Sequence, residues 1–274
     1  MTERLFGCAF VSENEAKNDA GINNRAATYA NGNAEEKEAF ASLAHIFKRY
    51  GDKTVFHDFS LEIYCGEILC ILGESGGGKT TLLNLLASQE EADDGEIFFP
   101  CCRGASLNGG VPRVSYAFQD DTLLPNLTAL GNLTFVGGEK EECVSLLRRA
   151  ELSDRADKIP RMLSGGEKQR VSLLRAFAAP FDLLLADEPF SALDVALKER
   201  MISLFLSLWR EKSQKERKTA VVVTHSVKEA LKIADRVIVL KNGRIAADRC
   251  VPKEDDEKQK ILRMEVLSAL IEED

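Results

Sequence analysis

The sequence predicts an α/β fold with a mainly parallel sheet, because short apolar runs alternate with stretches of helical spacing. The runs at residues 181–186 and 219–224 are largely apolar, as expected of parallel strands that are covered on both faces. A chain of 274 residues, 45% of them hydrophobic, is long enough to bury a core of this kind. The stretch at 196–210 has the spacing of a helix face, carried by Leu197, Met201, Leu204 and Leu208.

The first part of the chain, residues 1–40, differs from the rest in composition. It is rich in Ala and Asn and has no sustained period, so we expect a flexible N-terminal extension that is helical in part around residues 34–40. From Leu43 onward the pattern changes. Residues 43–47 and 55–63 partly alternate between apolar and polar side chains, as half-buried strands do.

Later segments complete the expected set of elements. Residues 114–118 predict a short strand, and residues 137–161 are charged with helical spacing. The run at 237–245 contains the dipeptide Asn242-Gly243, which favours a tight hairpin turn. The tail from Lys253 predicts a charged amphipathic helix, whose expected apolar side consists of Ile261, Leu262, Met264, Leu267 and Leu270.

Charge and composition argue against several classes of protein. The net charge of −8 lacks the basic excess of a nucleic-acid-binding surface, so no nucleic acid partner is expected. No apolar run approaches the ~20 residues that span a bilayer, and the apolar run at the start is too short for a signal peptide. The seven cysteines form no CxxC pair, and we expect all of them to be reduced, structural side chains in a cytosolic protein.

A glycine-rich loop between an expected strand and an expected helix is the most informative motif. Its glycines allow consecutive backbone N–H groups to converge on an anion, and the helix that follows adds its positive end. Lys79 supplies a charge for outer phosphates, and Thr80 supplies a hydroxyl for Mg²⁺. A turn that only caps a helix would not require Lys and Thr here, so the motif indicates a nucleoside triphosphate site. The loop consists of Gly73, Glu74, Ser75, Gly76, Gly77, Gly78, Lys79, Thr80 and Thr81.

A second motif, residues 183–188, is an apolar run that ends in two carboxylates. Beside a phosphate loop, Asp187 can hold Mg²⁺ through water, and Glu188 can polarise an attacking water. The alternative is a strand that leads into an acidic turn, which Pro189 would also suit. The presence of the phosphate loop favours the functional interpretation.

Several other residues have ordinary explanations when each is taken alone. Ser164 and Glu167 form a capping box at the start of an expected helix, although a capped helix start that exposes glycines is itself an anion site. Gln119 would be a solvated loop residue, and Tyr50 an ordinary loop aromatic. A lone His225 at the end of a strand is more often structural than catalytic.

The order of these pieces along the chain resembles that of the ATP-binding subunits of ABC transporters. The resemblance covers roughly residues 43–250 and implies a P-loop ATPase core with a mainly parallel sheet, an antiparallel β subdomain and a small helical subdomain at 120–165. The implied limits are 41–252 for the nucleotide-binding domain and 253–274 for a C-terminal helix. Residues 120–128 are further similar to the nitrate, sulfonate and taurine importer group. The resemblance is carried by Tyr50, 73–81, Gln119, 163–167, 183–188, 191–194 and His225.

This resemblance implies which residues hold ATP and its metal ion. The phosphates would bind the loop at 73–81, and Tyr50 would stack on the adenine. Mg²⁺ would be held by Thr80, Gln119 and Asp187.

The resemblance also implies the catalytic residues and a dimer contact. Glu188 would be the catalytic base, Gln119 would reach the attacking water, and His225 would sense the γ-phosphate. The signature segment, with Ser164, Gly165 and Gly166, would contact the γ-phosphate bound by a second subunit. Asp194 would lie at the same dimer contact.

The function implied is a peripheral subunit, on the cytoplasmic face of the cell membrane, that hydrolyses ATP to drive transport through a transmembrane permease subunit. Import of a small anionic or organic solute is expected, with a homodimer of ATP-binding subunits and, indirectly, a solute-binding protein. The alternatives are an exporter subunit, a soluble ABC ATPase outside transport, and a regulator that does not hydrolyse ATP. The chain has neither a long coiled coil nor a second nucleotide domain, which argues against the second. Glu188 and His225 argue against the third.

Overall fold

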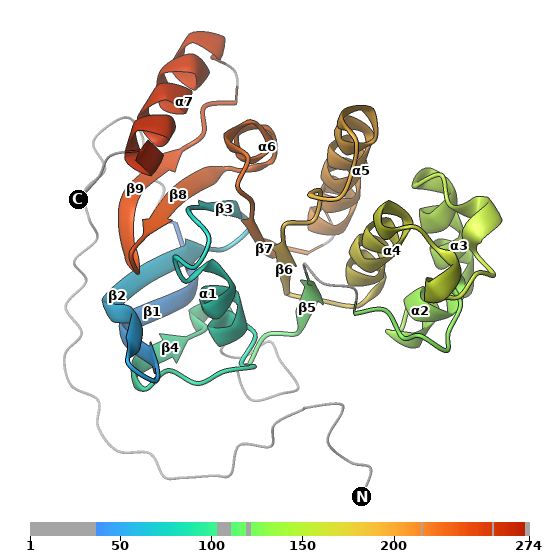
Figure 1. Cartoon of the computed structure of the whole chain (residues 1–274), viewed down its shortest axis with the longest axis horizontal. Helices are drawn as coiled ribbons and strands as arrows, with labels where there is room; N and C mark the ends of the chain where they lie inside the picture. The colour runs from blue at the N-terminus through green and yellow to red at the C-terminus, as the bar shows by residue number, and fades with distance from the viewer. Residues whose placement is uncertain (1–36, 103–110, 119–121, 215, 254, 272–274) are drawn as a thin grey trace, which may run out of the picture. The chain divides into compact units, whose positions relative to one another are not determined.

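The computed structural model describes residues 37–102, 111–118, 122–214, 216–253 and 255–271, which contain two sheets and the helices packed on them (Figure 1). A three-stranded antiparallel sheet has the order β2-β1-β4, and a six-stranded sheet has the order β5-β6-β7-β3-β8-β9. The pairings of the larger sheet are parallel except for the antiparallel pair β8–β9. The predicted α/β class, with an added antiparallel sheet, is confirmed.

The strands and helices have the following bounds. The antiparallel sheet consists of β1 (Ala39–Tyr50), β2 (Lys53–Tyr64) and β4 (Asp94–Phe98). The larger sheet consists of β3 (Ile68–Leu72), β5 (Val114–Ala117), β6 (Leu183–Asp187), β7 (Thr219–Val223), β8 (Arg236–Lys241) and β9 (Arg244–Cys250). The α-helices are α1 (Lys79–Leu86), α2 (Ala129–Phe135), α3 (Lys140–Arg149), α4 (Gly165–Ala178), α5 (Val195–Ser213), α6 (Val227–Ile233) and α7 (Asp256–Ile271). Short 3-10 turns lie at η1 (Pro100–Cys102), η2 (Ser153–Arg155) and η3 (Pro160–Met162).

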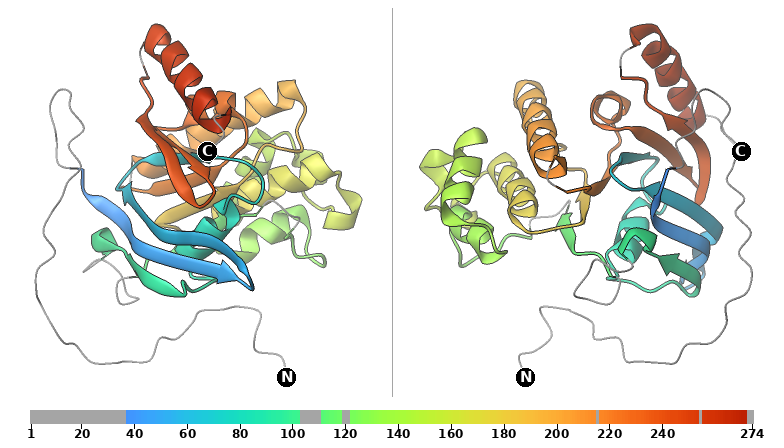
Figure 2. Two further views of the ribbon diagram at one scale, coloured as in Figure 1. Left: turned by 60° about the vertical axis from the view of Figure 1, so that its left-hand side comes forward. Right: turned by 180° about the vertical axis from the view of Figure 1, so that it is seen from behind.

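Side chains of the larger sheet alternate between two hydrophobic cores. On β3, Leu69 and Ile71 join the core formed with α1 and the antiparallel sheet, whereas Cys70 and Leu72 join the core formed with α4, α5 and α6. Every residue of β3, β6 and β7 is buried, which explains why these strands are apolar at successive positions. Figure 2 shows the antiparallel sheet and the helices α2–α4 at opposite ends of the described part.

The first strand begins earlier than the sequence predicts. Ala39 pairs with Tyr64 of β2, so Ala39 and Phe40 are strand residues and not the end of a helix around 34–40. Strand pairing buries Phe40, which a solvated helix would leave exposed. Lys37 and Glu38 are described and are not helical, whereas the start of the expected helix and the expected flexible extension, up to residue 36, lie outside the described residues.

In the region where a helical subdomain is expected, α2 and α3 pack against each other and against α4, and η2 packs against α3. The C-terminal helix α7 is also present, and Leu267 and Leu270 of its expected apolar side are partly buried against the core. Leu262 and Val266 are buried, whereas Ile261 and Met264 are exposed. Within the described residues, no helix is both long and apolar enough to span a bilayer.

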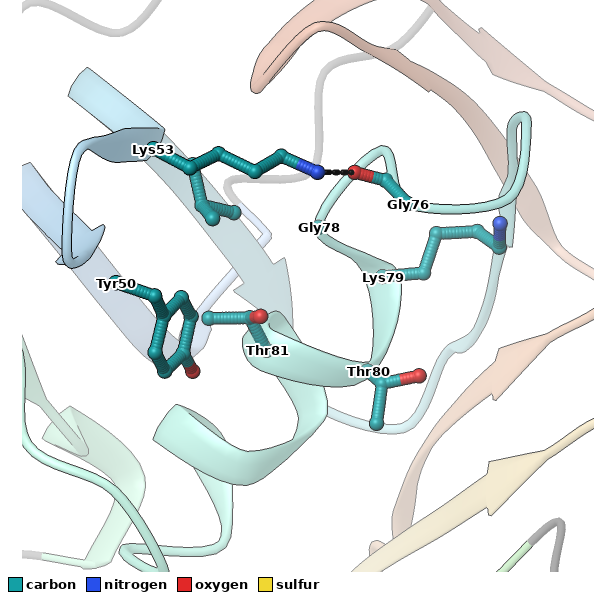
Figure 3. Close-up of a pocket in the computed structure, with 8 residues that line it drawn as sticks. Tyr50, Lys53, Gly76, Gly78, Lys79, Thr80 and Thr81 are labelled. Atoms are coloured by element: carbon teal, nitrogen blue, oxygen red, sulfur yellow. Dashed lines mark hydrogen bonds between the residues drawn. The ribbon is translucent and has the colours of Figure 1, made fainter.

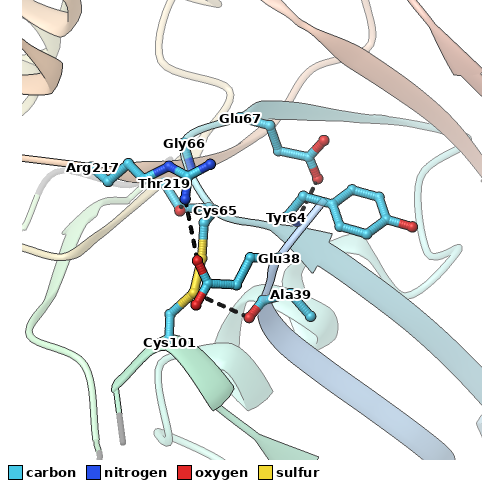
Figure 4. The surroundings of a disulfide bond; sticks show 9 residues. All are labelled: Glu38, Ala39, Tyr64, Cys65, Gly66, Glu67, Cys101, Arg217 and Thr219. Atoms are coloured by element: carbon cyan, nitrogen blue, oxygen red, sulfur yellow. Dashed lines mark hydrogen bonds and ion pairs between the residues drawn. A yellow bond between two sulfur atoms is a disulfide. The ribbon is translucent and has the colours of Figure 1, made fainter. Parts of the chain in front are cut away.

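Two cysteines differ from the expectation that all seven are reduced. Cys65, which follows β2, and Cys101, in η1, are joined by a disulfide bond (Figure 4). They are 36 positions apart in the sequence, and β1 brings them together because it pairs with β2 on one side and β4 on the other. A pairing set by strand order is invisible to a search for closely spaced cysteines.

Candidate functional site

The glycine loop lies at the carboxyl end of β3, near the middle of the larger sheet. It leads into α1, whose N-cap is Gly78 and whose first residues are Lys79 and Thr80. The Lys79 ammonium donates hydrogen bonds to the carbonyl oxygens of Gly73 (2.9 Å) and Glu74 (2.7 Å). Lys79 and the N-terminal N–H groups of α1 therefore form one positive concavity, suited to an anion.

Burial and nearby carboxylates act in opposite directions on Lys79. The side chain is mostly buried, and desolvation lowers the pKa of its ammonium. The charges of Glu188, Asp187 and Glu74 act against this shift. A partly desolvated ammonium interacts strongly with a phosphate that contacts it directly, because the local dielectric constant is low.

A pocket of about 240 Å³ opens between this loop and the β1–β2 hairpin. Figure 3 shows the ring of Tyr50 beside Thr81, and the Lys53 side chain extending toward Gly76. The Lys53 ammonium donates to the Gly76 carbonyl oxygen at 3.5 Å. The hairpin thus supplies an aromatic face and the loop supplies a positive concavity, a combination that fits a base attached to phosphates. The lining consists of Tyr50, Lys53, Val55, Gly76, Gly78, Lys79, Thr80 and Thr81.

Hydrogen bonding fixes the orientation of the Tyr50 ring. Its hydroxyl donates to the Glu90 carboxylate, which also accepts a hydrogen bond from the Asn84 amide at 2.8 Å. Burial, followed by this contact with Glu90, raises the pKa of the Tyr50 hydroxyl, so it stays protonated. Tyr50 remains 45% exposed, which leaves ring surface available to a ligand.

Strand order brings the first acid of the second motif to the glycine loop. β6 and β3 both pair with β7, so their carboxyl ends lie at the same edge of the sheet. The Thr80 hydroxyl donates to Asp187 Oδ2 at 2.8 Å, across 107 residues of sequence. A hydroxyl and a carboxylate that converge in this way offer the oxygen ligands that Mg²⁺ prefers.

The second acid lies next to the expected switch histidine. Glu188 Oε2 is 3.3 Å from His225 Nδ1, and the Glu188 backbone N–H donates to the Val223 carbonyl oxygen at 2.9 Å. Glu188 has a φ of 47°, in the left-handed region that non-glycine residues rarely adopt. Strained backbone of this kind is concentrated at functional sites, where the surrounding contacts hold it in place.

A residue that the sequence analysis did not single out, Gln169 of α4, holds the loop after Glu188. Its amide nitrogen donates to the Glu188 carbonyl oxygen at 2.9 Å and to Ser191 Oγ at 3.0 Å. Its amide oxygen accepts from the Ala192 backbone N–H at 3.0 Å. The signature helix and the acidic loop are thereby joined within one subunit.

The signature segment is a well-formed helix start. Ser164 Oγ accepts from the Glu167 backbone N–H at 3.3 Å, and a Glu167 carboxylate oxygen accepts from the Ser164 N–H at 2.7 Å, completing the predicted capping box. Arg155 Nε donates to Glu167 Oε1 at 2.7 Å. These contacts with Ser164 and Arg155 lower the pKa of Glu167.

The second of the expected dimer-contact elements is also a helix start. Asp194 is the N-cap of α5, and its Oδ1 accepts from the Leu197 N–H at 3.0 Å. Neither Asp194 nor Ser164 contacts the pocket beside Tyr50 in this chain. The structure therefore groups Tyr50, the glycine loop, Asp187, Glu188 and His225, while the signature forms a separate exposed surface.

The described residues leave out one predicted site residue, and they add two residues that were not predicted. Gln119 lies outside the described residues. Lys53 and Gln169 were missed, because their roles depend on contacts across the fold and neither belongs to a motif considered in the sequence. The position of Lys53, three residues after Tyr50 and beyond the turn at 51–52, was the one local signal available for it.

Known proteins share both the sequence and the fold of this chain. Residues 56–191 match the family model described as ABC transporter. The aliphatic sulfonates import ATP-binding protein SsuB of Granulibacter bethesdensis is 39% identical over 237 residues, covering 84% of this chain and 93% of that protein. A protein of the same description, SsuB 1 of Paracoccus denitrificans, is 41% identical over 215 residues, covering 77% of this chain and 83% of that protein.

Solved structures agree with these relatives. A dimeric post-hydrolysis state of the ATP-binding cassette MJ0796, bound to ADP and Pi, matches with a TM-score of 0.66 and 29% identity, covering 77% of this chain and 99% of that chain. Another dimeric structure of the same bacterial ABC transporter cassette matches with a TM-score of 0.65 and 31% identity, over the same shares of the two chains. Sequence and structure together identify this chain as a member of the ABC transporter family, among its ATP-binding proteins.

Proposed function

We propose that this chain hydrolyses ATP to drive the import of an aliphatic sulfonate, or a closely related small organic anion, through a permease. The ATPase activity is supported by one observation, the convergence of Lys79, Thr80, Asp187 and Glu188 at one edge of the sheet. The importer and its solute class are supported by relatives about 40% identical that are named for sulfonate import.

Each catalytic group has a role that fits its position. Lys79 binds the outer phosphates, and Tyr50 stacks on the adenine. Glu188 accepts a proton from the attacking water, and His225, 3.3 Å from it, keeps this carboxylate oriented toward the γ-phosphate. Gln119 is proposed to contact the same water and the metal ion, on the resemblance of its sequence position alone.

The residues present fit a Mg²⁺ ion. Thr80 Oγ1 and Asp187 Oδ2 already lie 2.8 Å apart, and both are oxygen ligands of the kind that this ion takes. Mg²⁺ bound there with ATP would neutralise the charge that develops on the phosphates. Thr80 would ligate the ion directly, and Asp187 would hold it through water.

The partner proposed is a transmembrane permease, with this chain attached peripherally on the cytoplasmic side. The test is to purify the full chain together with the membrane protein that it binds, and to reconstitute the complex in liposomes with ATP and Mg²⁺ on the side of the nucleotide subunits. We expect ATP-dependent uptake of an alkanesulfonate, supplied with the solute-binding protein of the same system. Hydrolysis without sulfonate uptake would refute the solute class, and a complex without ATP hydrolysis would refute the ATPase.

The proposed assembly is a head-to-tail homodimer, in which the signature of one subunit contacts the ATP held by the other. A glycine that this chain does not itself require supports this arrangement. Gly165 begins α4, yet a Cβ built there would meet no described heavy atom within 4 Å, and its φ is not in the left-handed region. The absence of a side chain here would leave room for a phosphate bound by a second subunit.

Gly165→Ala is expected to leave the isolated chain as stable as before, or more stable by up to about 1 kcal/mol, because Ala is the better helix former. The same change should weaken ATP-dependent association and ATPase activity. Thermal unfolding of the monomer and the protein-concentration dependence of ATPase activity measure the two effects.

Gly73→Ala is the matched control for that change. A Cβ at Gly73 would lie 2.1 Å from the Leu240 carbonyl oxygen, at a φ of +156°, so it should destabilise the fold itself. If Gly165→Ala lowered stability as well, or left association intact, the glycine would have no role toward a second subunit.

Substitution of Tyr50 tests where the purine base of the nucleotide binds. Tyr50→Ala should weaken nucleotide affinity clearly, whereas Tyr50→Phe should be mild, since Phe keeps the ring and loses the hydroxyl that bonds to Glu90. Stacking accepts any purine, so ATP and GTP should differ little in affinity. Titration with a fluorescent nucleotide measures all three proteins, and equal affinities would place the base elsewhere.

A further inference from the structure

The disulfide between Cys65 and Cys101 encloses the segment that carries the phosphate-binding loop. Cys65 immediately precedes the turn into β3, and Cys101 follows β4. The closed segment therefore contains β3, residues 73–81, α1 and β4. A covalent bond between its ends restricts the unfolded segment and so favours its folded state.

The two sulfur atoms differ in environment from the buried free thiols. Cys65 and Cys101 are both partly exposed, whereas Cys70 and Cys143 are fully buried, and burial raises the pKa of each of those two thiols. Thiolate character and access govern thiol–disulfide exchange. Among these four described cysteines, the bonded pair is the one that a small thiol can reach.

The reduced form also has a hydrogen-bonding partner in place. The Cys101 sulfur lies 3.2 Å from the Ala39 carbonyl oxygen, which can accept the S–H of a free thiol. The Cys65 backbone N–H donates to the Glu38 carbonyl oxygen at 2.9 Å, a bond that does not depend on the sulfur. Reduction therefore leaves the Cys101 thiol with an acceptor and the Cys65 backbone hydrogen bond intact, so the strands can keep their places.

Charged side chains surround the pair (Figure 4). A Glu38 carboxylate oxygen lies within 4.8 Å of both sulfur atoms, and Arg217 pairs with this carboxylate at 3.2 Å. The carboxylate repels a thiolate that forms beside it, and Arg217 offsets part of that repulsion. Glu38 should therefore slow exchange at this site.

We propose that Cys65 and Cys101 form a reversible redox site that takes small-molecule disulfides, such as oxidised glutathione, and locks the ATP-binding segment against unfolding. One protein thiolate attacks the small disulfide, forms a mixed disulfide and releases one small thiolate. The second protein thiolate then attacks the mixed disulfide at the protein sulfur and releases the other small thiolate. The protein loses two electrons and two protons in total, and the small disulfide gains them.

The experiment uses the full chain, equilibrated with mixtures of reduced and oxidised glutathione. Differential alkylation and peptide mass spectrometry should find a linkage between the peptides of Cys65 and Cys101 that disappears with excess reductant. The melting temperature should be about 5–15 °C higher in the oxidised protein. Cys101→Ser should abolish this difference, whereas Cys250→Ser, at an exposed cysteine outside the pair, should preserve it.

A further variant distinguishes a reactive disulfide from one that only stabilises the fold. Glu38→Gln should speed alkylation of the reduced pair and leave the linkage itself intact. Peptide mapping and melting do not depend on ATP, so their outcome is separate from that of the proposed ATPase. Should Cys101→Ser fail to fold, reduction of the unmodified chain gives the same comparison.

Four results would overturn the proposal. Both thiols could remain alkylatable after treatment with oxidised glutathione, or the linkage could involve the adjacent Cys102 in place of Cys101. The melting temperature could be the same in both redox forms. Finally, Zn²⁺ could protect the reduced pair from oxidation with Glu38 as a third ligand, which would make this a metal site.

Discussion

Glu188→Gln should bind ATP with almost unchanged affinity and lose about 10²–10⁴-fold in turnover, the usual scale for loss of a general base. Gln keeps the shape of Glu188 and can still hydrogen-bond to His225, whose Nδ1 is 3.3 Å from the carboxylate. It cannot accept the proton of the attacking water. Single-turnover hydrolysis and equilibrium ATP binding, measured on the same preparation, give the two quantities.

Lys79→Ala provides the contrast, because it removes a buried charge from the outer phosphates before and during the reaction. Its main effect should be on ATP affinity, with turnover falling as a result. Near-normal ATPase activity in Glu188→Gln would remove this residue from the catalytic role and leave Asp187 as the nearest carboxylate.

In the Glu188→Gln background, ATP with Mg²⁺ should convert the chain from mostly monomer to dimer, and ADP should not. In the proposed head-to-tail dimer, the γ-phosphate would bridge to the partner's signature. Adding Ser164→Arg should abolish the dimer and preserve ATP binding by the monomer. Size-exclusion chromatography with light scattering measures the shift in mass.

Ser164→Ala is the control for this second prediction. It removes the capping oxygen that accepts from Glu167, at a cost of about 1 kcal/mol, but adds no bulk to the surface. It should keep more of the dimer than Ser164→Arg. A dimer that forms equally with ADP, or that survives Ser164→Arg, would mean that the signature residues only cap a helix.

The parallel strands and the pieces of the site at their ends were predictable from the sequence. Buried strands such as β6 and β7 are apolar at successive positions, and this composition is visible without any knowledge of their partners. Asp187, the last residue of β6, and His225, which follows shortly after β7, could therefore be expected at a common edge of the sheet. The close approach of Asp187 to Thr80, and of His225 to Glu188, required the strand order as well.

The features that could not be predicted are those that depend on contacts between residues far apart in the sequence. β4 begins Asp-Gly-Glu, which no strand pattern favours, and it is a strand because it pairs with β1. In α7 the apolar residues occupy more than one side of the helix, so periodicity could not select Leu262 and Val266 over Ile261 and Met264. Gln169 and the Cys65–Cys101 bond depend on packing across the fold in the same way.

The central place of β3 has a consequence for the growing chain during synthesis. Both neighbours of β3 in the sheet, β7 and β8, are formed by residues 219–241, so the strand before the phosphate loop emerges long before either edge can be paired. At about 5–20 residues per second, the apolar segment Ile68–Leu72 waits on the order of ten seconds with both edges open. Nascent chains stalled before Thr219 should therefore hold the phosphate loop without its sheet, bind ATP poorly, and depend on chaperones that shield open strand edges.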